Sequence, residues 1–579
     1  MSYSNSKFRN FISNFIGYQE KEDYHFDLPE TKLDKSLENN TCIVDTTGPI
    51  EEKIQKQSIY ESLSDNENYI KVRYNAMINS DIILRDFTLT IRNKQYNGFL
   101  LYIDGMVDSK MINESILTPL MLRNRANIYD GPQEKVVSAP PPNRVTVKKV
   151  KSFDLADYIS NCLVPQNTIK KVETFNDLVS GVNSGNCALF VDTLPFAFDI
   201  EVKGFKQRSI DTPNNEIVIR GSQEAFVEVI RTNTSMLRRI VNNENLVIEN
   251  IEIGDLSNTK CAVCYMKNIA NEDLVAEVKY RLNNLEIDYL LSSGQLEQLI
   301  EDNGKYSIPQ MLSTERPDKA TNYLLEGRVV ILVNGSPYSL AMPATFLDFV
   351  SSPEDSNLKF QFANLLKVIR IFALFIALLL PGIYVAITNY HQELIPTELL
   401  YTIVATRETV PFLIIFEILI MELSFELIRE AGLRVPSPIG PTIGIVGALV
   451  LGQAAVSASV VSPILIIIVA ITGICSFAIP DFSLSFHIRL IRFLFIITGY
   501  FLGFLGISIS LFVYLAIMSS LKSFGVPFLV PYAPVTNNSG ATYFVKPIWK
   551  RENRADFLNT KKRRAQKRIS MKWKYGDKI

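Results

Sequence analysis

Residues 366–388 read LKVIRIFALFIALLLPGIYVAIT, a run whose only charges, Lys367 and Arg370, stand near its start. The run is long enough to cross a bilayer as a helix, which needs roughly 20 apolar residues. Four more stretches of the second half share this character: 409–428, 438–457, 459–479 and 491–518. Residues 1–360 carry charges throughout and hold no such run. The pattern predicts a large head followed by an all-α polytopic membrane domain, 361–535, of four to five helices.

The head reads as two α/β subdomains behind a polar arm. Residues 1–85 are rich in Asn, Ser, Glu and Lys and are expected to be flexible, because they cannot bury a core of their own. Beyond them, strand-like runs such as FLLYIDGMVD and RVVILVNG alternate with helical patterns. We place the first α/β subdomain at 86–208 and the second at 209–360. No repeat of fixed period is visible between them.

The charge of the chain is unevenly distributed. The formal net charge is −1, yet the tail 536–579 holds thirteen Lys/Arg against three acids, so that +10 in the tail leaves −11 elsewhere. A basic run beside a membrane segment is typical of the cytoplasmic side and of binding to anionic lipid headgroups. Nucleic-acid binding is the weaker interpretation, since no recognised nucleic-acid fold accompanies KKRRAQKR (561–568). The first residues lack an apolar signal core, so the head and the tail are both expected in the cytoplasm.

The sequence offers no candidate for a catalytic, cofactor-binding or metal-ligating site. Cys261 and Cys264 form a CxxC, but they stand in a strand-like run, where residues three apart point to opposite faces. Two buried apolar cysteines are the better interpretation. The three histidines are scattered, and the phosphate-loop pattern GxxxxGK[ST] is absent. We therefore predict that the protein is not an enzyme and binds no cofactor.

Three glutamates lie in or beside the apolar segment 409–428. An ionised carboxylate there is costly unless it meets water, a partner or the membrane interface. At about 100° per residue, Glu422 and Glu426 share one helix face, whereas Glu417 points the opposite way. Two interpretations stay open. Either the carboxylates line a cation path, or the helix lies in the interface or packs against partner subunits with its acids paired.

Topology bears on this choice. If all five segments crossed the membrane, the basic tail would end outside, against the positive-inside rule. One segment is therefore expected not to cross, and 409–428 is the first candidate because of its acids.

Segment 438–457 is dense in Gly, Ala and Ser, which lets helices approach closely, and it carries one central amide, Gln453. We predict that it lines an oligomer axis with Gln453 facing water. Val456, three residues on, would then form an apolar constriction that gates by dewetting. The alternative is ordinary small-residue packing, with Gln453 hydrogen-bonded sideways.

Nine stretches, in order along residues 90–535, resemble the GerA family of spore-germination receptor A subunits. They are YIDGMVD (102–108), EIVIRGSQEAFVE (216–228), RTNTSMLRRI (231–240), TERPD (314–318), EGRVVILVNGSP (326–337), LLLPGIYVAI (378–387), TRETVPF (406–412), RVPSPIGPTIGIVGALVLGQAAVSASVVSP (434–463) and FAIPDFSLSFHIRLIRF (477–493).

The resemblance implies a cytoplasmic head of two subdomains and a multi-helix domain in the spore inner membrane. It also implies assembly with a permease-like B subunit and a lipoprotein C subunit, and a homo-oligomer of A subunits around an ion pathway. The leading hypothesis is therefore a subunit of a nutrient-responsive germination receptor that forms or gates this pathway. A solute transporter subunit and a scaffold of a related germination complex are the alternatives.

Within TERPD, we expect Glu315, Arg316 and Asp318 to couple the head to the membrane domain. Pro317 restricts Arg316 to extended backbone, so that its guanidinium can be held toward a carboxylate on a neighbouring element. The alternative is a solvated loop.

Overall fold

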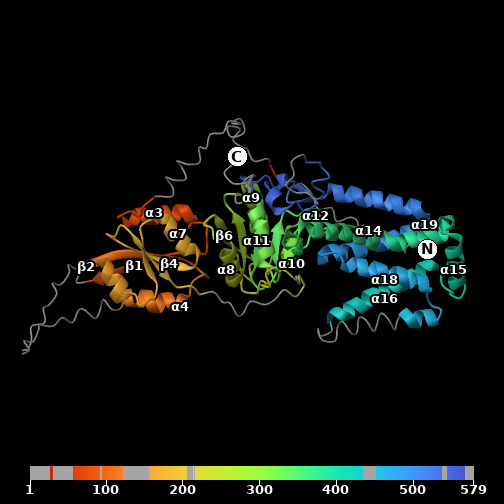
Figure 1. Cartoon of the computed structure of the whole chain (residues 1–579), viewed down its shortest axis with the longest axis horizontal. Helices are drawn as coiled ribbons and strands as arrows, with labels where there is room; N and C mark the ends of the chain where they lie inside the picture. The colour runs from red at the N-terminus through yellow and green to blue at the C-terminus, as the bar shows by residue number, and fades with distance from the viewer. Residues whose placement is uncertain are drawn as a thin grey trace, which may run out of the picture.

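The computed structural model describes residues 26–29, 57–91, 94–121, 155–204, 213, 215–218, 220–434, 452–536 and 544–566. Figure 1 shows three bodies in succession along the long axis, namely a first sheet, a second sheet and a set of helices. This confirms the expected fold class, an α/β head of two subdomains followed by an all-α domain.

The first subdomain is a five-stranded antiparallel sheet of strand order β1-β2-β4-β5-β3, with helices on both faces. Its elements are α3 (Leu63–Tyr74), β1 (Ile82–Ile91), β2 (Lys94–Ile103), α4 (Ser109–Met111), η2 (Ile112–Leu117), α6 (Leu155–Tyr158), η3 (Ile159–Leu163), β3 (Ile169–Val172), α7 (Phe175–Asn183), β4 (Asn186–Val191) and β5 (Ala197–Glu201). Helices α3 and α7 pack on one face, and η2, α6 and η3 pack on the other. The Asp-Gly turn after β2 forms because Gly105 adopts φ +87°.

Part of the expected flexible arm is folded, so that prediction is wrong for residues 57–85. They contain α3 and the start of β1, and Ile59, Ile70 and Tyr74 are buried in the same core as Phe175. The polar composition hid this helix, because α3 buries only Asn66, Ile70 and Tyr74, one residue per turn. Residues 1–25 and 30–56 of the arm lie outside the described residues.

The second subdomain repeats this plan, with strand order β6-β7-β9-β10-β8. Its elements are α8 (Ile230–Ile240), β6 (Leu246–Ile253), β7 (Thr259–Met266), α9 (Glu272–Asn283), α10 (Ser293–Ile300), β8 (Leu312–Thr314), α11 (Pro317–Glu326), β9 (Val329–Val333), β10 (Ser339–Met342), α12 (Phe346–Phe349) and α13 (Glu354–Asn357). Helices α8 and α11 take the places that α3 and α7 hold in the first subdomain. Cys261 and Cys264 both lie buried in β7.

A buried arginine joins the two subdomains. Arg238 of α8 is 2% exposed and donates from Nε and Nη2 to the two carboxylate oxygens of Asp81, at 2.7 and 2.9 Å. Beside it, Ser80 N donates to Ile248 O of β6 at 3.0 Å. The loop before β1 is thereby held against the edge strand of the second sheet.

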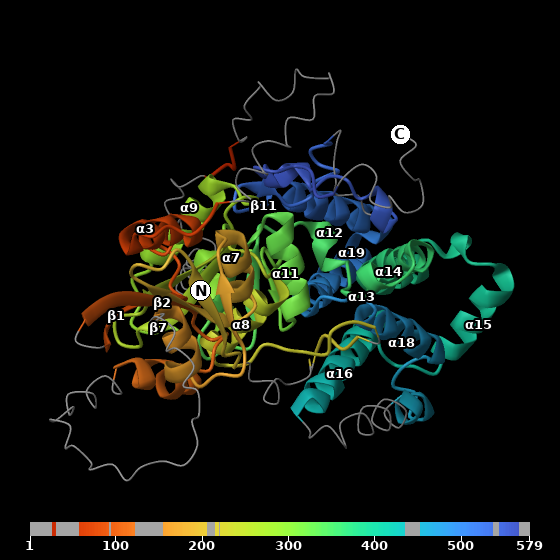
Figure 2. The same cartoon turned by 60° about the vertical axis from the view of Figure 1, so that its left-hand side comes forward.

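The helical domain contains α14 (Phe360–Tyr390), α15 (Thr397–Arg407), α16 (Ile414–Arg434), α18 (Pro463–Phe477) and α19 (Phe482–Ser520). In the described part of the chain, α14 and α19 are the two helices long and apolar enough to cross a membrane. Helices α14, α18 and α16 lie next to one another (Figure 2), and α15 lies across the end of the domain that is farthest from the head (Figure 1).

Helix α19 is two antiparallel helices joined at Gly503, whose backbone is not helical (φ 59°, ψ −140°). His487 Nε2 lies 3.2 Å from Tyr514 Oη, although 27 residues of straight helix would separate them by about 40 Å. Both ends of the hairpin meet the head, since His487 Nδ1 lies 2.7 Å from Ser307 Oγ and Ser523 Oγ donates to Gln310 O at 2.6 Å. Its tip lies at the far end, where Tyr390 Oη donates to Phe501 O.

The core of the second subdomain runs into the helical domain without interruption. One buried cluster joins Leu332 of β9 and Phe349 of α12 to Leu378 of α14 and Phe495 of α19. After α19, the strands β11 (Lys522–Ser523) and β12 (Val526–Pro527) form a small hairpin that packs on the head. The expected end of the membrane domain, residue 535, is therefore too late.

Tail residues 544–566 fold back onto the second subdomain. Lys561 Nζ pairs with Glu272 Oε1 of α9 at 2.5 Å, and Arg554 Nε donates to Leu325 O of α11 at 2.7 Å. Asn559 Nδ2 donates to Pro29 O at 3.2 Å, so a short N-terminal segment lies beside the tail. Residues 567–579, with the end of the basic run, lie outside the described chain.

Candidate functional site at the head joint and in the helical domain

Arg316 stands at the N-terminus of α11, where Pro317 is the first helical residue. Its backbone is extended (φ −99°, ψ 121°), as predicted from the proline. The side chain is fully buried, with Nε and Nη2 donating to the two oxygens of Asp318 at 3.1 and 2.8 Å. The prediction of a carboxylate on a neighbouring element is therefore wrong. The carboxylate belongs to the same turn, two residues on.

The neighbouring loop, residues 215–222, contributes backbone carbonyl oxygens as acceptors for Arg316. Arg316 Nη1 donates to Glu216 O at 3.1 Å, and Nη2 donates to Ser222 O at 2.9 Å. From the same motif, Glu315 Oε1 accepts from the backbone N–H of Asn215 and of Glu216, at 2.6 and 2.8 Å. Lys319 Nζ pairs with Glu216 at 2.6 Å. Two of the quoted stretches, TERPD and EIVIRGSQEAFVE, thus form one clamp.

This clamp reaches the helical domain through α13. Asn357 Nδ2 of α13 donates to Arg220 O in the clamped loop at 3.0 Å. Asp355, also of α13, accepts from Arg370 of α14 at 2.7 Å, and Lys367 of α14 donates to Ser351 Oγ at 3.0 Å. A chain of direct contacts therefore runs from α11 through the loop and α13 to α14. The sequence analysis missed Asn357.

A second contact between head and helices is acidic. Arg281 pairs with Asp302 at 2.5 Å, and Asp302 Oδ2 accepts from Phe524 N of the hairpin after α19. On α10, burial raises the pKa of Glu297 to about 7, and repulsion from Glu301 and Asp481 adds to the rise. Burial likewise raises the pKa of Glu301 to about 7, with repulsion from Asp302 as the second cause. The two carboxyl groups therefore change charge near neutral pH.

Glu422 and Glu426 of α16 point at arginines of α19, which confirms that they share one face. Arg492 pairs with Glu422 at 3.1 Å, and both side chains are almost completely buried. Glu426 accepts from Arg489 at 2.9 Å and from Arg429 at 2.6 Å. Arg489 lies between the predicted membrane segments 459–479 and 491–518, and Arg492 lies at the start of the second of them. Their spacing of three residues, opposite glutamates four apart, was the available signal.

Glu417 lies on the opposite face of α16, as predicted, and is also paired. It is 1% exposed, accepts from Ser462 N at 3.3 Å and lies 3.6 Å from a guanidinium nitrogen of Arg407 on α15. Arg407 belongs to the TRETVPF stretch and Ser462 to the long Gly-rich stretch, so Glu417 connects two of the quoted stretches. Helix α16 thus begins at the far end, beside α15, and reaches α19 near its head end.

Gln453 and Val456 lie in a short helical run, 452–457, where Gln453 is exposed and Val456 is half-buried. The preceding part of this segment, 438–451, lies outside the described residues. The assignment of Gln453 and Val456 to a pore therefore stays a prediction.

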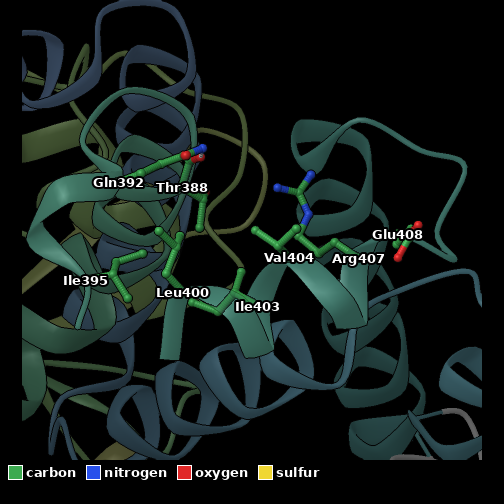
Figure 3. Close-up of a pocket in the computed structure, with 8 residues that line it drawn as sticks. All are labelled: Thr388, Gln392, Ile395, Leu400, Ile403, Val404, Arg407 and Glu408. Carbon is green, nitrogen blue, oxygen red and sulfur yellow. Dashed lines mark hydrogen bonds between the residues drawn. The ribbon is translucent and has the colours of Figure 1, made fainter. Parts of the chain in front are cut away.

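A pocket of about 460 Å³ opens at the far end, between the end of α14 and α15. Figure 3 shows its lining, with Thr388 and Gln392 on one side and Leu400 and Ile403 of α15 on the other. Arg407 and Glu408 stand at its edge. Within the described ranges, no group of three His, Cys, Asp or Glu side chains is arranged to hold a metal ion.

Comparison with known proteins gives a consistent result. A family model described as Bacillus/Clostridium GerA spore germination protein matches residues 68–557. Spore germination protein KA of Bacillus subtilis is 37% identical over 494 residues, which is 85% of this chain and 86% of that protein. Spore germination protein A1 of the same organism is 40% identical, over 62% and 75% of the two chains.

A solved structure is also similar. It is the N-terminal domain of the A subunit of the Bacillus megaterium spore germinant receptor GerK3, 31% identical, covering 50% of this chain and 98% of that one, with a TM-score of 0.37.

Proposed function

Because the chain belongs to the GerA family of spore germination proteins, we propose that it is the A subunit of a nutrient-responsive germination receptor that forms or gates an ion pathway. Its partners are a permease-like B subunit and a lipoprotein C subunit, its place is the spore inner membrane, and it has no enzymatic role. The observation that carries the gating part is the joint between head and helices. A shared buried core and the Arg316 clamp transmit any displacement of the second subdomain to α14 and α19.

We assign the lining of the ion pathway to the segment that carries Gln453 and Val456. Gln453 is exposed on a helix of an apolar domain, where an amide needs water or another polar group. A symmetric arrangement of several copies around a water-filled axis supplies both, and the glycines of 438–457 allow the close approach. Val456 is three residues on and serves as the constriction.

The glutamates of α16 take part in gating and do not line the ion pathway as unpaired negative charges. Glu417, Glu422 and Glu426 each lie against an arginine of the same chain, so their negative charge is largely compensated. We assign them to holding α16 against α15 and α19, so that a change in these ion pairs accompanies opening.

The hairpin of α19 and the contacts between tail and head support six membrane crossings in place of four or five. The crossings are α14, α16, the segment 438–457, α18 and the two halves of α19, each half being about 20 residues long. An even number keeps the head and the tail on one side, as their direct contacts require. The odd number of five crossings came from counting α19 as one crossing. With α19 counted as two, α16 can cross the membrane and the tail still ends on the same side as the head.

The test is cation flux in proteoliposomes that hold the chain with its B and C partners. We expect nutrient to trigger flux, Val456→Ala to leak cations without nutrient, and Gln453→Leu to suppress flux. Val513→Ala, at an exposed position of α19, is the matched control and should behave as wild type. Amounts of reconstituted protein are compared by immunoblot. Normal flux in both pore variants would sink the pore assignment.

A further inference from the structure

The tail stretch FVKPIWKR, residues 544–551, combines exposed apolar side chains with basic ones. Phe544, Ile548 and Trp549 are 54%, 62% and 43% exposed, which is unusual for three large apolar residues so close together in a short loop. Lys546 is exposed between Phe544 and Ile548, Lys550 is exposed directly after Trp549, and Arg551 follows. Aromatic and aliphatic side chains interleaved with lysines are typical of segments at a membrane–water interface.

This stretch is fixed beside the first turns of α14. Asn364 makes two hydrogen bonds with the backbone of Val545, from Nδ2 to Val545 O at 3.2 Å and from Val545 N to Oδ1 at 2.6 Å. Gln566 Nε2 donates to Ile548 O at 2.6 Å from the other side. The position of the loop relative to α14 is therefore set by the fold.

The charges of α14 give the depth at which the loop lies. Arg370 is the last charged residue of the helix, and from there to Tyr390 the helix is uncharged. Asn364 stands six residues closer to the head, roughly 9 Å at the helical rise. Because the polar layer of a bilayer adds roughly 5–8 Å on each side of the apolar core, Asn364 and Val545 come at the outer edge of the lipid headgroup layer.

Helix α14 carries an exposed apolar side close to the loop. Phe362, Leu365, Ile369 and Phe372 are all more than half exposed on α14, which is what a lipid-facing helix side requires. Val545, the residue after Phe544 in the loop, is hydrogen-bonded to Asn364, the residue before Leu365 on α14.

We propose that residues 544–551 are a membrane-interface anchor, in which Ile548 and Trp549 enter the bilayer surface while Lys546, Lys550 and Arg551 bind anionic phospholipid headgroups. This deepens the proposed function, on whose membrane placement of α14 it rests. It also narrows the expected lipid contact of the basic tail to one loop, since Lys561 of the KKRRAQKR run pairs with the head instead. The anchor ties the tail to the joint between head and α14.

The chain has two tryptophans, Trp549 and Trp573, so Trp573→Phe leaves a single reporter in the anchor. We would place the full chain in nanodiscs that contain phospholipid brominated on the acyl chain, close to the headgroup. We expect strong quenching of Trp549 fluorescence. The quenching should be stronger when bromine is carried by phosphatidylglycerol in plain phosphatidylcholine than when the two roles are exchanged.

One further variant separates the possible failures. A deeper reporter is Phe372→Trp in a chain with both native tryptophans changed to Phe, and it reports α14 alone. Quenching of that reporter with none of Trp549 would overturn the anchor while leaving the membrane placement intact. Absence of quenching at both would overturn the membrane placement and the anchor with it.

The charge part has its own control. The double variant Lys546→Gln, Lys550→Gln should reduce the preference for phosphatidylglycerol about fivefold for each charge removed. The matched double variant Lys562→Gln, Arg563→Gln, at exposed positions further along the tail, should retain it. An equal loss in both would overturn the assignment to this loop.

Discussion

Arg316 makes its contacts in two directions, and that is what makes it a clamp. Its Nε and Nη2 donate to Asp318 in its own turn, and its Nη1 and Nη2 donate to carbonyl oxygens of a loop nearly 100 residues earlier. The planar group with five donors suits this task, because it can satisfy a carboxylate along one edge and carbonyls along the other. A lysine would offer a single ammonium group to all of these acceptors.

Arg316→Ala should lower the free energy of unfolding by roughly 2–4 kcal/mol, because two carbonyl oxygens and a carboxylate lose their donor in a buried site. Arg316→Lys should recover only part of this. Thermal unfolding of the full chain in detergent, followed by circular dichroism, measures the effect. Arg220→Ala, an exposed arginine of the same loop, is the control and should leave the melting temperature unchanged. A loss of stability without any loss of nutrient response in spores would limit Arg316 to the fold of the head.

Glu297 should make stability depend on pH. Its pKa is about 7 in the folded chain and near 4.5 when unfolded, so the folded state binds the proton more tightly. Its contribution to stability is therefore fully present below pH 4.5 and is lost as the pH rises to 7. Glu297→Gln should melt like wild type at pH 5 and at a higher temperature at pH 8. The control is Glu286→Gln, an exposed glutamate before α10. An equal difference at both pH values would contradict this assignment.

For single residues, the sequence predicted the helix face or backbone conformation but not the residues that they contact. The faces of Glu417, Glu422 and Glu426 followed from helical periodicity, which is a local property. Arg489 and Arg492 were not predicted as partners, because they are more than 60 residues away from Glu426 and Glu422 in the sequence. Arg316 was placed correctly in extended backbone by Pro317, yet its carbonyl partners are backbone atoms, which leave no pattern in a sequence.

Among the elements, α19 differs most from what its sequence predicts, because one apolar segment was expected and the structure has two antiparallel helices. Hydropathy averages over a window and gives one long apolar run here, because the residues around the hairpin tip at Gly503 include no charged side chain. The break is marked by a glycine alone, and glycines are common in membrane helices. The contacts of His487 with Tyr514 and with Ser307, which set the fold of the hairpin, join residues far apart in the chain.

Gly503→Ala should destabilise this hairpin. A φ of 59° with a ψ of −140° is open only to glycine, and an added Cβ would also lie 3.1 Å from His391 Nε2. The cost should be about 1–3 kcal/mol, seen as a lower melting temperature in detergent. Gly432→Ala in α16 is the matched control, because a Cβ there meets nothing within 4 Å, and it should be neutral or slightly stabilising. Equal melting temperatures of the two variants would count against the hairpin.

The molecule as a whole contains a duplication that the sequence conceals. Both sheets have the same antiparallel strand order and the same placement of helices before the first strand and between the third and fourth. A strand order depends on which residues pair across long separations, so it survives substitutions that erase any fixed period. The second copy differs in its surroundings, because its core continues into α14 and α19. The first copy contacts the second through Arg238, and its described residues lie at the opposite end of the molecule from the helical domain (Figure 1).

The contacts of the head and the tail with each other show that both ends of the helical domain lie on the same side. The head precedes α14 and the tail follows α19, yet tail residues 544–566 bind α9 and α11 of the head. A protein cannot make these contacts across a bilayer, so in the membrane placement that we propose the number of crossings between Phe360 and Ser520 is even. With the four other crossings of that proposal, a straight α19 would make the number odd, and the hairpin at Gly503 makes it even.

Labelling of single cysteines in a cysteine-free chain tests this arrangement. Leu394 after α14 and Leu502 beside Gly503 are exposed at the far end, and Leu256 and Asn553 are exposed on the head and the tail. With a membrane-impermeant maleimide on intact protoplasts, we expect labelling at Leu394→Cys and Leu502→Cys. Leu256→Cys and Asn553→Cys should react only after the membrane is opened. A straight α19 would bury position 502 in mid-membrane, so its protection in intact and opened cells, with position 394 labelled, would refute the hairpin. Labelling of Asn553→Cys in intact cells would instead refute the even number of crossings, because it would place the tail opposite the head.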